Sequence, residues 1–288
     1  MSGVQSDGGP GDAPGSPVTI MQSHGYSASA FDVLRYRSGA RVSTADDLAV
    51  ECPIAFEFNG ISHVVMLATP SDLIDFAVGF SLSEGLIDRP EEIFDIEVRP
   101  AETGIILEIT VTSRCFNRIK QRRRSLMGRT GCGLCGIEAL DALGIRPEPI
   151  KDKRSFSRQH FLNAVRHLPA VQPLQAQTGS THAAAWLSAS GDIMHVREDV
   201  GRHNAVDKLI GAVSKSGLSF SDGALVVTSR ASIEIIQKAA ALGIGFVAAI
   251  SAPTSMAVEL ARSCGITLLG FLRGQDYVVY AREQDLTE

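Results

Sequence analysis

Several classes of protein are excluded by what this sequence has little of. Among its 288 residues only 6% are aromatic, with one tryptophan and four tyrosines, and 32 acidic residues outnumber 27 basic ones for a net charge of −5. An acidic chain with so few rings for base stacking does not fit a nucleic-acid-binding protein, so any phosphate contact must come from a local basic patch. The 44% hydrophobic and 20% charged content also excludes a wholly disordered or fibrous chain.

Long apolar runs and targeting signals are lacking as well. The most apolar run, residues 239–250, is far shorter than the ~20 residues needed to span a bilayer. The first basic residue is Arg35, which leaves neither the charged start of a signal peptide nor an arginine-rich transit peptide. We therefore expect a cytoplasmic protein with no membrane contact. Residues 1–30 are rich in glycine, serine and proline, and we predict a disordered tail there because they cannot bury enough apolar surface.

Cysteine is scarce and odd in number. The five cysteines are Cys52, Cys115, Cys132, Cys135 and Cys264. A secreted disulfide framework has a denser, even set in a small domain, so this count indicates a reducing compartment. Only Cys132 and Cys135 are close enough in sequence to share chemistry, and we expect the other three to be buried structural thiols.

The first part of the chain predicts a strand-rich α+β subdomain over residues 31–113. Asn59-Gly60 between two apolar runs predicts a hairpin, because both turn residues need positive φ. Residues 69–72 (Thr-Pro-Ser-Asp) resemble a helix start, and Gly85 is a helix stop. The predicted elements are strands at 31–37, 50–58 and 61–67, a helix between 69 and 85, and strands at 93–98 and 105–111.

From residue 137 onward the chain predicts an α/β domain that extends to residue 288. The predicted elements are a helix at 159–167, a hairpin of strands 182–187 and 192–196, helix 202–213, strand 224–227, helix 231–241, strand 246–250, helix 254–262 and strand 266–269. This alternation predicts crossover units and a largely parallel, twisted sheet with helices on its faces. Ligands of such sheets bind beyond the carboxyl ends of the strands, so the residues after each strand are the first candidates for a site.

A basic segment and a Cys-x-x-Cys loop, residues 114–136, separate the two parts. Seven basic residues occur here without an acid among them: Arg114, Arg118, Lys120, Arg122, Arg123, Arg124 and Arg129. Such a run is most often a solvated face. Beside reactive thiols it could also lower a thiolate pKa or dock a phosphate-bearing ligand or an acidic partner.

Glycines flank and separate Cys132 and Cys135, which leaves both sulfurs accessible. Two such thiols fit three functions: half of a zinc site, a thioredoxin-like redox pair, or a carrier thiol that accepts sulfur as a persulfide and passes it on. No second Cys-x-x-Cys completes a zinc site, and the glycines favour a loop over the strand and helix of a thioredoxin-like pair. Two incidental cysteines in a glycine-rich turn are the non-functional interpretation.

Four turns that follow predicted strands carry serine or arginine. They are residues 197–204, 228–232, 251–254 and 271–274. In the first, Arg202 and His203 stand at a helix N-terminus, where backbone N–H groups and the positive dipole end attract anions. A turn stapled by an internal Arg–Asp pair would explain the same string. Together the four turns predict a pocket for a phosphorylated, nucleotide-containing ligand.

His182 serves to exclude one enzyme class. Zinc-dependent base deaminases combine His-x-Glu with a later Pro-Cys-x-x-Cys. Here Ala184 stands two residues after His182, no proline precedes Cys132, and the cysteines come before the histidine. The general acid/base of zinc deamination is therefore missing. A lone histidine at a strand start is more often packed or hydrogen-bonded than catalytic.

Several motifs occur in a distinctive combination with Cys132-x-x-Cys135. They are Gly179-x-x-His182-Ala183-Ala184, the string from Asp199 to Lys208 (DVGRHNAVDK), Ser251-Ala252-Pro253-Thr254, Gly270-Phe271-Leu272-Arg273-Gly274 and, in the first part, Thr69-Pro70 and Ser83-Glu84-Gly85-Leu86-Ile87. With these motifs the chain resembles the formate dehydrogenase accessory sulfurtransferases, the FdhD/NarQ family, over residues 31–281. Residues 228–230 depart from the family, which often has a glycine before the arginine.

The resemblance implies a cytidine-deaminase-like α/β sandwich in the C-terminal part, without deaminase chemistry. It implies a sulfurtransferase that takes sulfur from a cysteine desulfurase as a persulfide on the loop. The sulfur would go to the molybdenum (or tungsten) bis(guanine dinucleotide) cofactor, a bound substrate, before that cofactor enters formate dehydrogenase. We expect no tightly bound zinc. We expect the protein to form a homodimer. A non-catalytic chaperone that hands the molybdenum cofactor to its enzyme is the alternative.

The resemblance also suggests a role for individual residues. Cys132 would carry the sulfane sulfur, and Cys135 would assist as a second thiol. The guanine dinucleotide would lie against the four turns. The residues expected to bind it are Arg202, His203, Arg230, Phe271, Leu272, Arg273, Gly274, Gln275 and Asp276.

Overall fold

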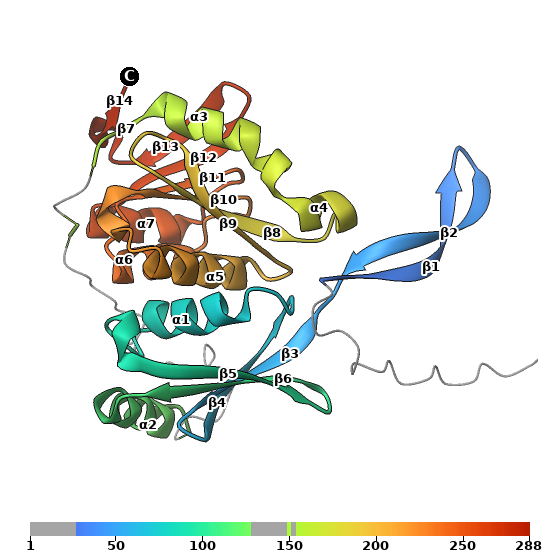
Figure 1. Ribbon diagram of the computed structural model, residues 1–288. Coiled ribbons are helices and arrows are strands. Elements are labelled where there is room, and N and C mark those ends of the chain that lie inside the picture. Colours follow the sequence, from blue (N-terminus) through green and yellow to red (C-terminus); the bar gives the residue numbers. More distant parts are fainter. Residues whose placement is uncertain (1–26, 128–148, 151–153) are drawn as a thin grey trace, which may run out of the picture.

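The computed structural model describes residues 27–127, 149–150 and 154–288, with the backbone alone for 122–127. The predicted loop with Cys132 and Cys135 and most of the predicted N-terminal tail therefore lie outside the described residues. Within them the fold is mixed α/β, with two main sheets, one small two-stranded sheet and one projecting two-stranded arm (Figure 1).

The N-terminal half is built on a four-stranded sheet with strand order β4-β3-β6-β5. Its strands are β3 (Cys52–Phe58), β4 (Ile61–Ala68), β5 (Ile93–Ala101) and β6 (Gly104–Val111), and helix α1 (Leu73–Ser83) covers one face. Asn59 and Gly60 have φ of 47° and 76°, which confirms the predicted hairpin. The helix and all four strands confirm the α+β prediction for this part of the chain.

The arm consists of β1 (Ala28–Arg37) and β2 (Ala40–Ala49), paired antiparallel over ten residue pairs. The strand predicted at residues 31–37 is confirmed, but its partner β2 was not predicted. Because β2 also pairs with residues 28–30, the predicted boundary of the tail at residue 30 was wrong by three residues. Strand β2 was not recognised because charged residues interrupt its alternation of apolar and polar side chains.

The basic segment also contains an element that the sequence reading missed. Helix α2 (Ser113–Met127) carries six of its seven basic residues. Lysine, arginine and glutamine are good helix formers, and this propensity could have predicted the helix from the sequence.

The C-terminal half is built on a six-stranded sheet with strand order β13-β12-β11-β10-β8-β9. Its strands are β8 (His182–Leu187), β9 (Ile193–Asp199), β10 (Ala224–Val227), β11 (Phe246–Ala249), β12 (Thr267–Arg273) and β13 (Asp276–Ala281). Strand β11 pairs in parallel with β10 and with β12, and the other three strand pairs of this sheet are antiparallel. The prediction of a largely parallel sheet was therefore wrong. Tight hairpins place β9 and β13 next to their sequence neighbours, which makes those pairs antiparallel.

Helices cover both faces of this sheet (Figure 1). One hydrophobic core holds α5 (Arg202–Lys215), α6 (Ile233–Ala241) and α7 (Ser255–Cys264), and a second holds α3 (Arg158–His167) and the short pair β7 (Phe156–Ser157) and β14 (Leu286–Thr287). The short helix α4 (Pro173–Thr178) precedes β8. The helices and strands predicted from residue 159 onward all occur, which confirms the α/β prediction at this level, while a helical stretch expected from about residue 137 lies outside the described residues.

Two glycines bring the two halves together. α1 packs along α5, and a Cβ built on Gly79 would lie 1.7 Å from the Asp207 carbonyl oxygen, while one on Gly211 would lie 1.9 Å from the Asp75 carbonyl oxygen. Only glycine permits backbones to approach so closely. As a result one hydrophobic core runs from the four-stranded sheet through α1 and α5 to the six-stranded sheet.

Candidate functional site

The carboxyl ends of four strands lie at one edge of the six-stranded sheet. β10, β11 and β12 are parallel, and β9 points the same way because both β9 and β10 run antiparallel to β8. The segments that follow these strands therefore share an edge with His182, at the start of β8. In open α/β sheets this edge is where ligands bind.

Backbone hydrogen bonds join neighbouring turns along this edge. The Thr254 N–H donates to the Ala231 carbonyl at 3.0 Å, and the Phe271 N–H donates to the Ser251 carbonyl at 3.2 Å. The prediction that these turns come together is thus confirmed as a matter of geometry. The segment after β9 reaches the segment after β10 through His203 and Ser232, whose Nε2 and Oγ atoms lie 3.3 Å apart, so the four segments form one continuous rim.

Arg202 and His203 open helix α5 at this rim. The Nε of Arg202 is buried and has no hydrogen-bond partner among the described residues. His203 Nε2 lies 3.3 Å from Ser232 Oγ and 3.7 Å from a carboxylate oxygen of Glu234. Burial, followed by the charge of Arg202, lowers the pKa of His203 below its ordinary 6.5. An arginine with an unused donor and a neutral imidazole at a helix N-terminus suit an anion.

His182 and Arg230 lie on the same rim with different exposure. Burial and then the charge of Arg202 lower the pKa of His182. His182 lines an open pocket with Gln172, Gln175, Gly179, Ser180, Thr181 and Thr228. Arg230 is exposed, and its guanidinium makes no hydrogen bond or ion pair within the part of the chain that the structure describes.

The segment from Phe271 to Asp276 differs from the predicted turn. β12 extends to Arg273, so Phe271 and Leu272 are strand residues, and the chain reverses at Gly274, whose φ is 62°. Leu272 is only 1% exposed and belongs to the hydrophobic core, so its side chain cannot reach a ligand. Phe271 has the unusual φ of 54° for a bulky residue and presents an exposed ring.

A second group of motif residues is buried beneath the rim. Asp199 and Lys208 are fully buried and paired at 2.7 Å, and the Lys208 ammonium also donates to the Thr69 carbonyl at 2.8 Å. The Asp199 carboxylate accepts the N–H groups of Thr69 at 3.0 Å and Gly201 at 2.7 Å, and the amide of Asn204 at 2.9 Å. These residues therefore fix the turn that carries Arg202 rather than face a ligand.

The predicted Arg–Asp staple within residues 197–204 does not form. Arg197 instead reaches α1, where it pairs with Asp75 at 2.6 Å, and Lys215 approaches the same carboxylate at 2.5 Å. Asp199 takes Lys208 as its partner. The physical reason is the packing of α1 on α5, which brings buried carboxylates and cations from the two halves together.

Lys238 is a buried residue that sequence reasoning missed. Its ammonium lies 2.9 Å from Asp207 and 2.8 Å from Glu84, and the Ser83 hydroxyl donates to Asp207 at 2.6 Å. A lysine among the apolar residues of the predicted helix 231–241 was the signal that could have found it. Ser83 and Glu84, which belong to a motif named in the sequence analysis, thus join α1 to α5 and α6.

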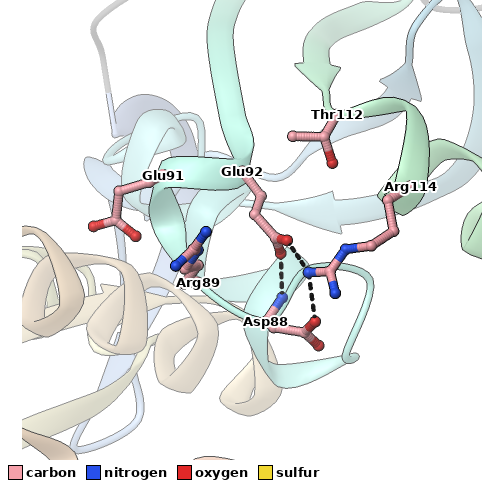
Figure 2. A pocket seen from close by; sticks show the side chains of 6 residues that line it. All are labelled: Asp88, Arg89, Glu91, Glu92, Thr112 and Arg114. Carbon is pink, nitrogen blue, oxygen red and sulfur yellow. Dashed lines mark hydrogen bonds and ion pairs between the residues drawn. The ribbon is translucent and has the colours of Figure 1, made fainter.

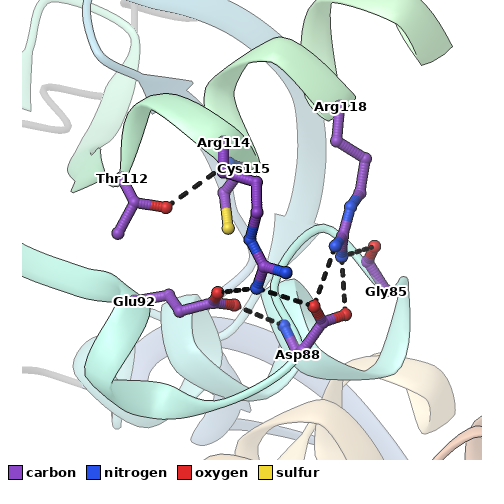
Figure 3. Close-up of polar contacts among 7 residues, drawn as sticks. All are labelled: Gly85, Asp88, Glu92, Thr112, Arg114, Cys115 and Arg118. Atoms are coloured by element: carbon purple, nitrogen blue, oxygen red, sulfur yellow. Dashed lines mark hydrogen bonds and ion pairs between the residues drawn. The ribbon is translucent and has the colours of Figure 1, made fainter.

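The base of helix α2 shows how part of the basic segment is used. Arg118 pairs with Asp88 at 2.7 Å, and Arg114 bridges Asp88 at 2.9 Å and Glu92 (Figures 2 and 3). The segment contains no acidic residue, but Asp88 and Glu92 from another part of the chain lie against its first arginines. These two arginines are neutralised by ion pairs, so the first turns of α2 offer less positive charge to an anion than the sequence of the basic segment suggests.

Glu92 lies deepest in this group. Burial alone would raise its pKa, but the hydrogen bonds from the Asp88 N–H and the Arg114 guanidinium lower the pKa of Glu92 to about 2. Glu92 and Arg114 also line a surface pocket with Asp88, Arg89, Glu91 and Thr112 (Figure 2). The arrangement ties α2 to the segment between α1 and β5.

The three described cysteines are free and buried, as predicted: Cys52, Cys115 and Cys264. Burial raises the pKa of Cys52 and of Cys264, which disfavours their thiolates. Among the described residues no three histidine, cysteine or acidic side chains are grouped so that they could hold a metal ion. Within that same part of the chain, no helix combines the length and the apolar content needed to cross a membrane.

The sequence matches named proteins over nearly the whole chain. The sequence is 52% identical over 258 residues to the sulfur carrier protein FdhD of Cupriavidus necator, with 90% of each chain covered. It is 48% identical over 254 residues to the protein of the same name from Variovorax paradoxus, covering 88% of this chain and 91% of that one. The corresponding protein of Bordetella petrii is 45% identical over 256 residues, with 88% and 92% covered.

The fold has a counterpart among solved structures. A formate dehydrogenase accessory protein from Desulfotalea psychrophila superimposes with a TM-score of 0.71, covering 90% of this chain and 99% of that chain at 22% identity. The model of the FdhD/NarQ family matches residues 49–287, which include both sheets, the rim and the buried pairs beneath it. The chain therefore belongs to the FdhD/NarQ family.

Proposed function

We propose that this protein is a sulfur carrier for the maturation of formate dehydrogenase. The observation that carries the proposal is that relatives 45–52% identical over about nine-tenths of the chain are named sulfur carrier protein FdhD. The pair Cys132 and Cys135 supplies the chemistry, because it is the one cysteine pair close in sequence. The buried state of the other three thiols supports the same assignment.

The sulfur transfer we propose is a thiolate exchange. The Cys132 thiolate attacks the outer sulfur of a persulfide on a cysteine desulfurase, and the donor cysteine leaves as a thiolate. The persulfide is held until the acceptor cofactor is bound; attack of the Cys135 thiolate on Cys132 Sγ then releases hydrosulfide and leaves a Cys132–Cys135 disulfide. A cellular dithiol reduces that disulfide before the next cycle. The hydrosulfide is the sulfur delivered to the molybdenum bis(guanine dinucleotide) cofactor.

The rim of the six-stranded sheet is the proposed site for that cofactor. Arg202, with its unpartnered Nε, and the exposed Arg230 would bind phosphate oxygens. His203 would contribute its imidazole ring beside them, and the exposed hairpin from Phe271 to Asp276 would lie against the guanine dinucleotide. Leu272 would contribute its backbone alone, because its side chain is in the core.

Mass spectrometry tests the persulfide directly. The purified protein is incubated with a cysteine desulfurase and cysteine, and we expect an added mass of ~32 Da on Cys132 or Cys135, one sulfur atom retained as persulfide. Cys264→Ser is the matched control, because that thiol is buried and should not affect loading. Absence of added sulfur on both loop cysteines would contradict the proposal.

A non-catalytic chaperone for the molybdenum cofactor is the competing function, because the rim would serve it equally well. Cys132→Ala separates the two functions. A chaperone with this substitution still activates formate dehydrogenase in cells that lack the natural protein, whereas a sulfur carrier does not. Binding of guanosine diphosphate, which both functions require, shows that the variant is folded.

The partners follow from this proposal. They are a cysteine desulfurase as donor, formate dehydrogenase as client, and a second copy of the chain in a homodimer. The cytidine-deaminase-like description of the C-terminal sandwich belongs to the proposal as well. It is supported by the strand order and by helices on both faces of the six-stranded sheet.

A further inference from the structure

A polar pocket lies next to the rim, where helix α4 meets the start of β8 (Figure 1). Its volume is about 520 Å³, which is within the range of small-molecule sites. The residues that line it are Gln172, Gln175, Gly179, Ser180, Thr181, His182 and Thr228. They include none of the residues proposed above to bind the phosphates or to lie against the guanine dinucleotide.

The lining of this pocket is uncharged. The described residues that line it include no lysine, arginine, aspartate or glutamate. Burial and then the charge of Arg202 lower the pKa of His182 below 6.5, so its imidazole is neutral at pH 7.5. A phosphate, an amine or a carboxylate would give up its water here without a counter-charge. The pocket therefore suits an uncharged polar group.

The side chain of Gln175 is fixed with its donor end free. Its Oε1 accepts the Thr181 N–H at 2.8 Å and lies 3.3 Å from the Thr181 hydroxyl. A backbone N–H can only donate, so this contact also determines which end of the amide is the oxygen. The Nε2 group makes no hydrogen bond within residues 27–127, 149–150 and 154–288. Gln175 therefore offers an N–H donor to a ligand in the pocket.

Glu198, near the end of β9, holds Gln175 in this position. Its carboxylate oxygens accept the backbone N–H groups of Leu174 at 2.9 Å and Gln175 at 2.7 Å, and Thr181 Oγ1 lies 3.3 Å from one of them. The carboxylate is thus occupied by the chain itself. Because β9 also leads into the turn that carries Arg202, Glu198 fixes the pocket relative to the rim.

Gln172 is the residue that indicates a ligand most directly. It is only 6% exposed, yet its side-chain amide makes no hydrogen bond in the part of the chain that the structure describes. Buried amides in proteins nearly always have a partner, because an unpaired one destabilises the fold. Since Gln172 lines the pocket, a bound ligand would supply that partner.

The free groups of the two glutamines match one chemical edge. The fixed donor of Gln175 requires an oxygen acceptor on the ligand, and the carbonyl of Gln172 requires a donor. A 2-amino-4-oxopyrimidine ring has both, since its oxygen accepts while its ring N–H and amino group donate. Guanine and pterins share this ring. Adenine presents an amino group where guanine has the oxygen, so it would face Gln175 with a second donor.

We propose that this pocket recognises the 2-amino-4-oxopyrimidine edge of the ligand through Gln172 and Gln175. The Nε2 group of Gln175 donates to the ring oxygen, and the carbonyl of Gln172 accepts from the amino group. Phosphates attached to the ring bind on the adjacent rim at Arg202. This role rests on the cofactor binding proposed above, and it makes the two glutamines residues that determine specificity.

Isothermal titration of the full-length protein with guanosine and adenosine diphosphates tests the contact of Gln175. Wild type binds the guanine nucleotide at least about thirtyfold more tightly. Gln175→Glu keeps the acceptor for Thr181 but replaces the free donor by an oxygen, so the ratio of the two affinities falls to about threefold or less. Both ligands carry the same phosphates, so the added charge affects them equally.

Ala176→Glu is the matched control. Ala176 is exposed on the same helix, so the substitution adds the same charge but leaves the ratio of affinities at its wild-type value. Inosine diphosphate, which lacks the amino group, tests Gln172 separately. Wild type binds it about tenfold more weakly than guanosine diphosphate, and Gln172→Met binds the two equally. A merely structural role of Gln172 would not change this ratio.

Fluorescence titration with 6-methylpterin distinguishes guanine from pterin as the occupant. If guanine occupies the pocket, guanosine diphosphate displaces the pterin. If the pterin end of the cofactor occupies it, both glutamine variants lose 6-methylpterin about tenfold and leave guanosine diphosphate unaffected. The proposal is overturned if neither ligand responds to Gln175→Glu or Gln172→Met. Persulfide loading of Cys132 does not involve the pocket, so its failure would contradict the sulfur-carrier function alone.

Discussion

The rim of the six-stranded sheet and the base of helix α2 are both rich in arginine, but they differ in what surrounds the charge. At the rim, Arg202 keeps a buried donor without a partner and Arg230 is exposed. At the base of α2, Arg114 and Arg118 are held by Asp88 and Glu92. An arginine that is already paired contributes little attraction for an anion. The rim is therefore the better candidate for a phosphate ligand.

The largest expected effect lies in the buried pair that supports the rim. Lys208→Met leaves the Asp199 carboxylate buried without its cation, and we expect a loss of about 3–5 kcal/mol in the free energy of unfolding. Urea denaturation followed by circular dichroism measures this. The double variant Asp199→Asn with Lys208→Met should recover part of the loss. Equal losses in the single and double variants would mean that the pair is not coupled.

A smaller effect distinguishes the two arginine clusters by ligand binding. Arg202→Gln should weaken the binding of guanosine diphosphate about tenfold, equivalent to about 1.4 kcal/mol, while the stability of the fold changes little. Arg118→Gln is the matched control and should leave the affinity unchanged, since its guanidinium is bound to Asp88. Isothermal titration measures both. If Arg118→Gln weakened binding as much as Arg202→Gln, the comparison of the two clusters would fail.

The acid dependence of stability probes the base of α2. Glu92 has its pKa lowered from 4.5 to about 2 in the folded state, so its contribution is fully present above pH 4.5 and is lost as the pH falls through about 2. Because Arg114 is largely exposed and water screens the pair, we expect a contribution of about 1 kcal/mol. Urea midpoints measured from pH 6 to 2 should fall less steeply for Glu92→Gln than for wild type. Parallel curves would contradict the role given to Glu92.

The smallest expected effect concerns the pH dependence of binding at the rim. The pKa of His203 is lowered below 6.5 in the free protein, and a bound phosphate favours the protonated ring. Binding then takes up a proton, so guanosine diphosphate should bind about threefold more tightly at pH 6 than at pH 7.5. His203→Gln controls for titration of the phosphate itself and should show a weaker dependence. The same pH dependence in both proteins would remove His203 from the site.

The elements that sequence patterns identified are those with a local cause. The hairpin at Asn59-Gly60 requires two positive φ angles, and the short apolar strands of the second half alternate with helices that have clear starts and stops. Strand β2 was missed because its pattern is broken by charges, and helix α2 because its basic residues were read for their charge alone. The turns at the rim could be located because they directly follow recognisable strands.

The partners of the charged residues could not be found in the same way. Lys238 and Asp207 pair across 31 positions of sequence, and Thr69 meets Asp199 across 130. Sequence patterns specify which face of an element is apolar, but not which buried cation meets which buried carboxylate. The sequence of residues 199–208 suggests a ligand site. In the structure, however, Asp199, Asn204 and Lys208 are buried and hold the turn in place by hydrogen bonds.

By itself the sequence determined the class of the two halves, the order of the elements that it predicted, and the family, and it is the basis for the proposal that Cys132 and Cys135 are the reactive pair. These properties depend on local periodicity, turn chemistry and contiguous motifs. Tertiary structure alone decided that strand β8 runs antiparallel to β10 and that Gly79 and Gly211 allow α1 to lie on α5. It also decided which arginines of the acid-free segment are neutralised. The reason is that charge and packing act through distance in space, and residues far apart in the chain become neighbours only when the helices and sheets pack.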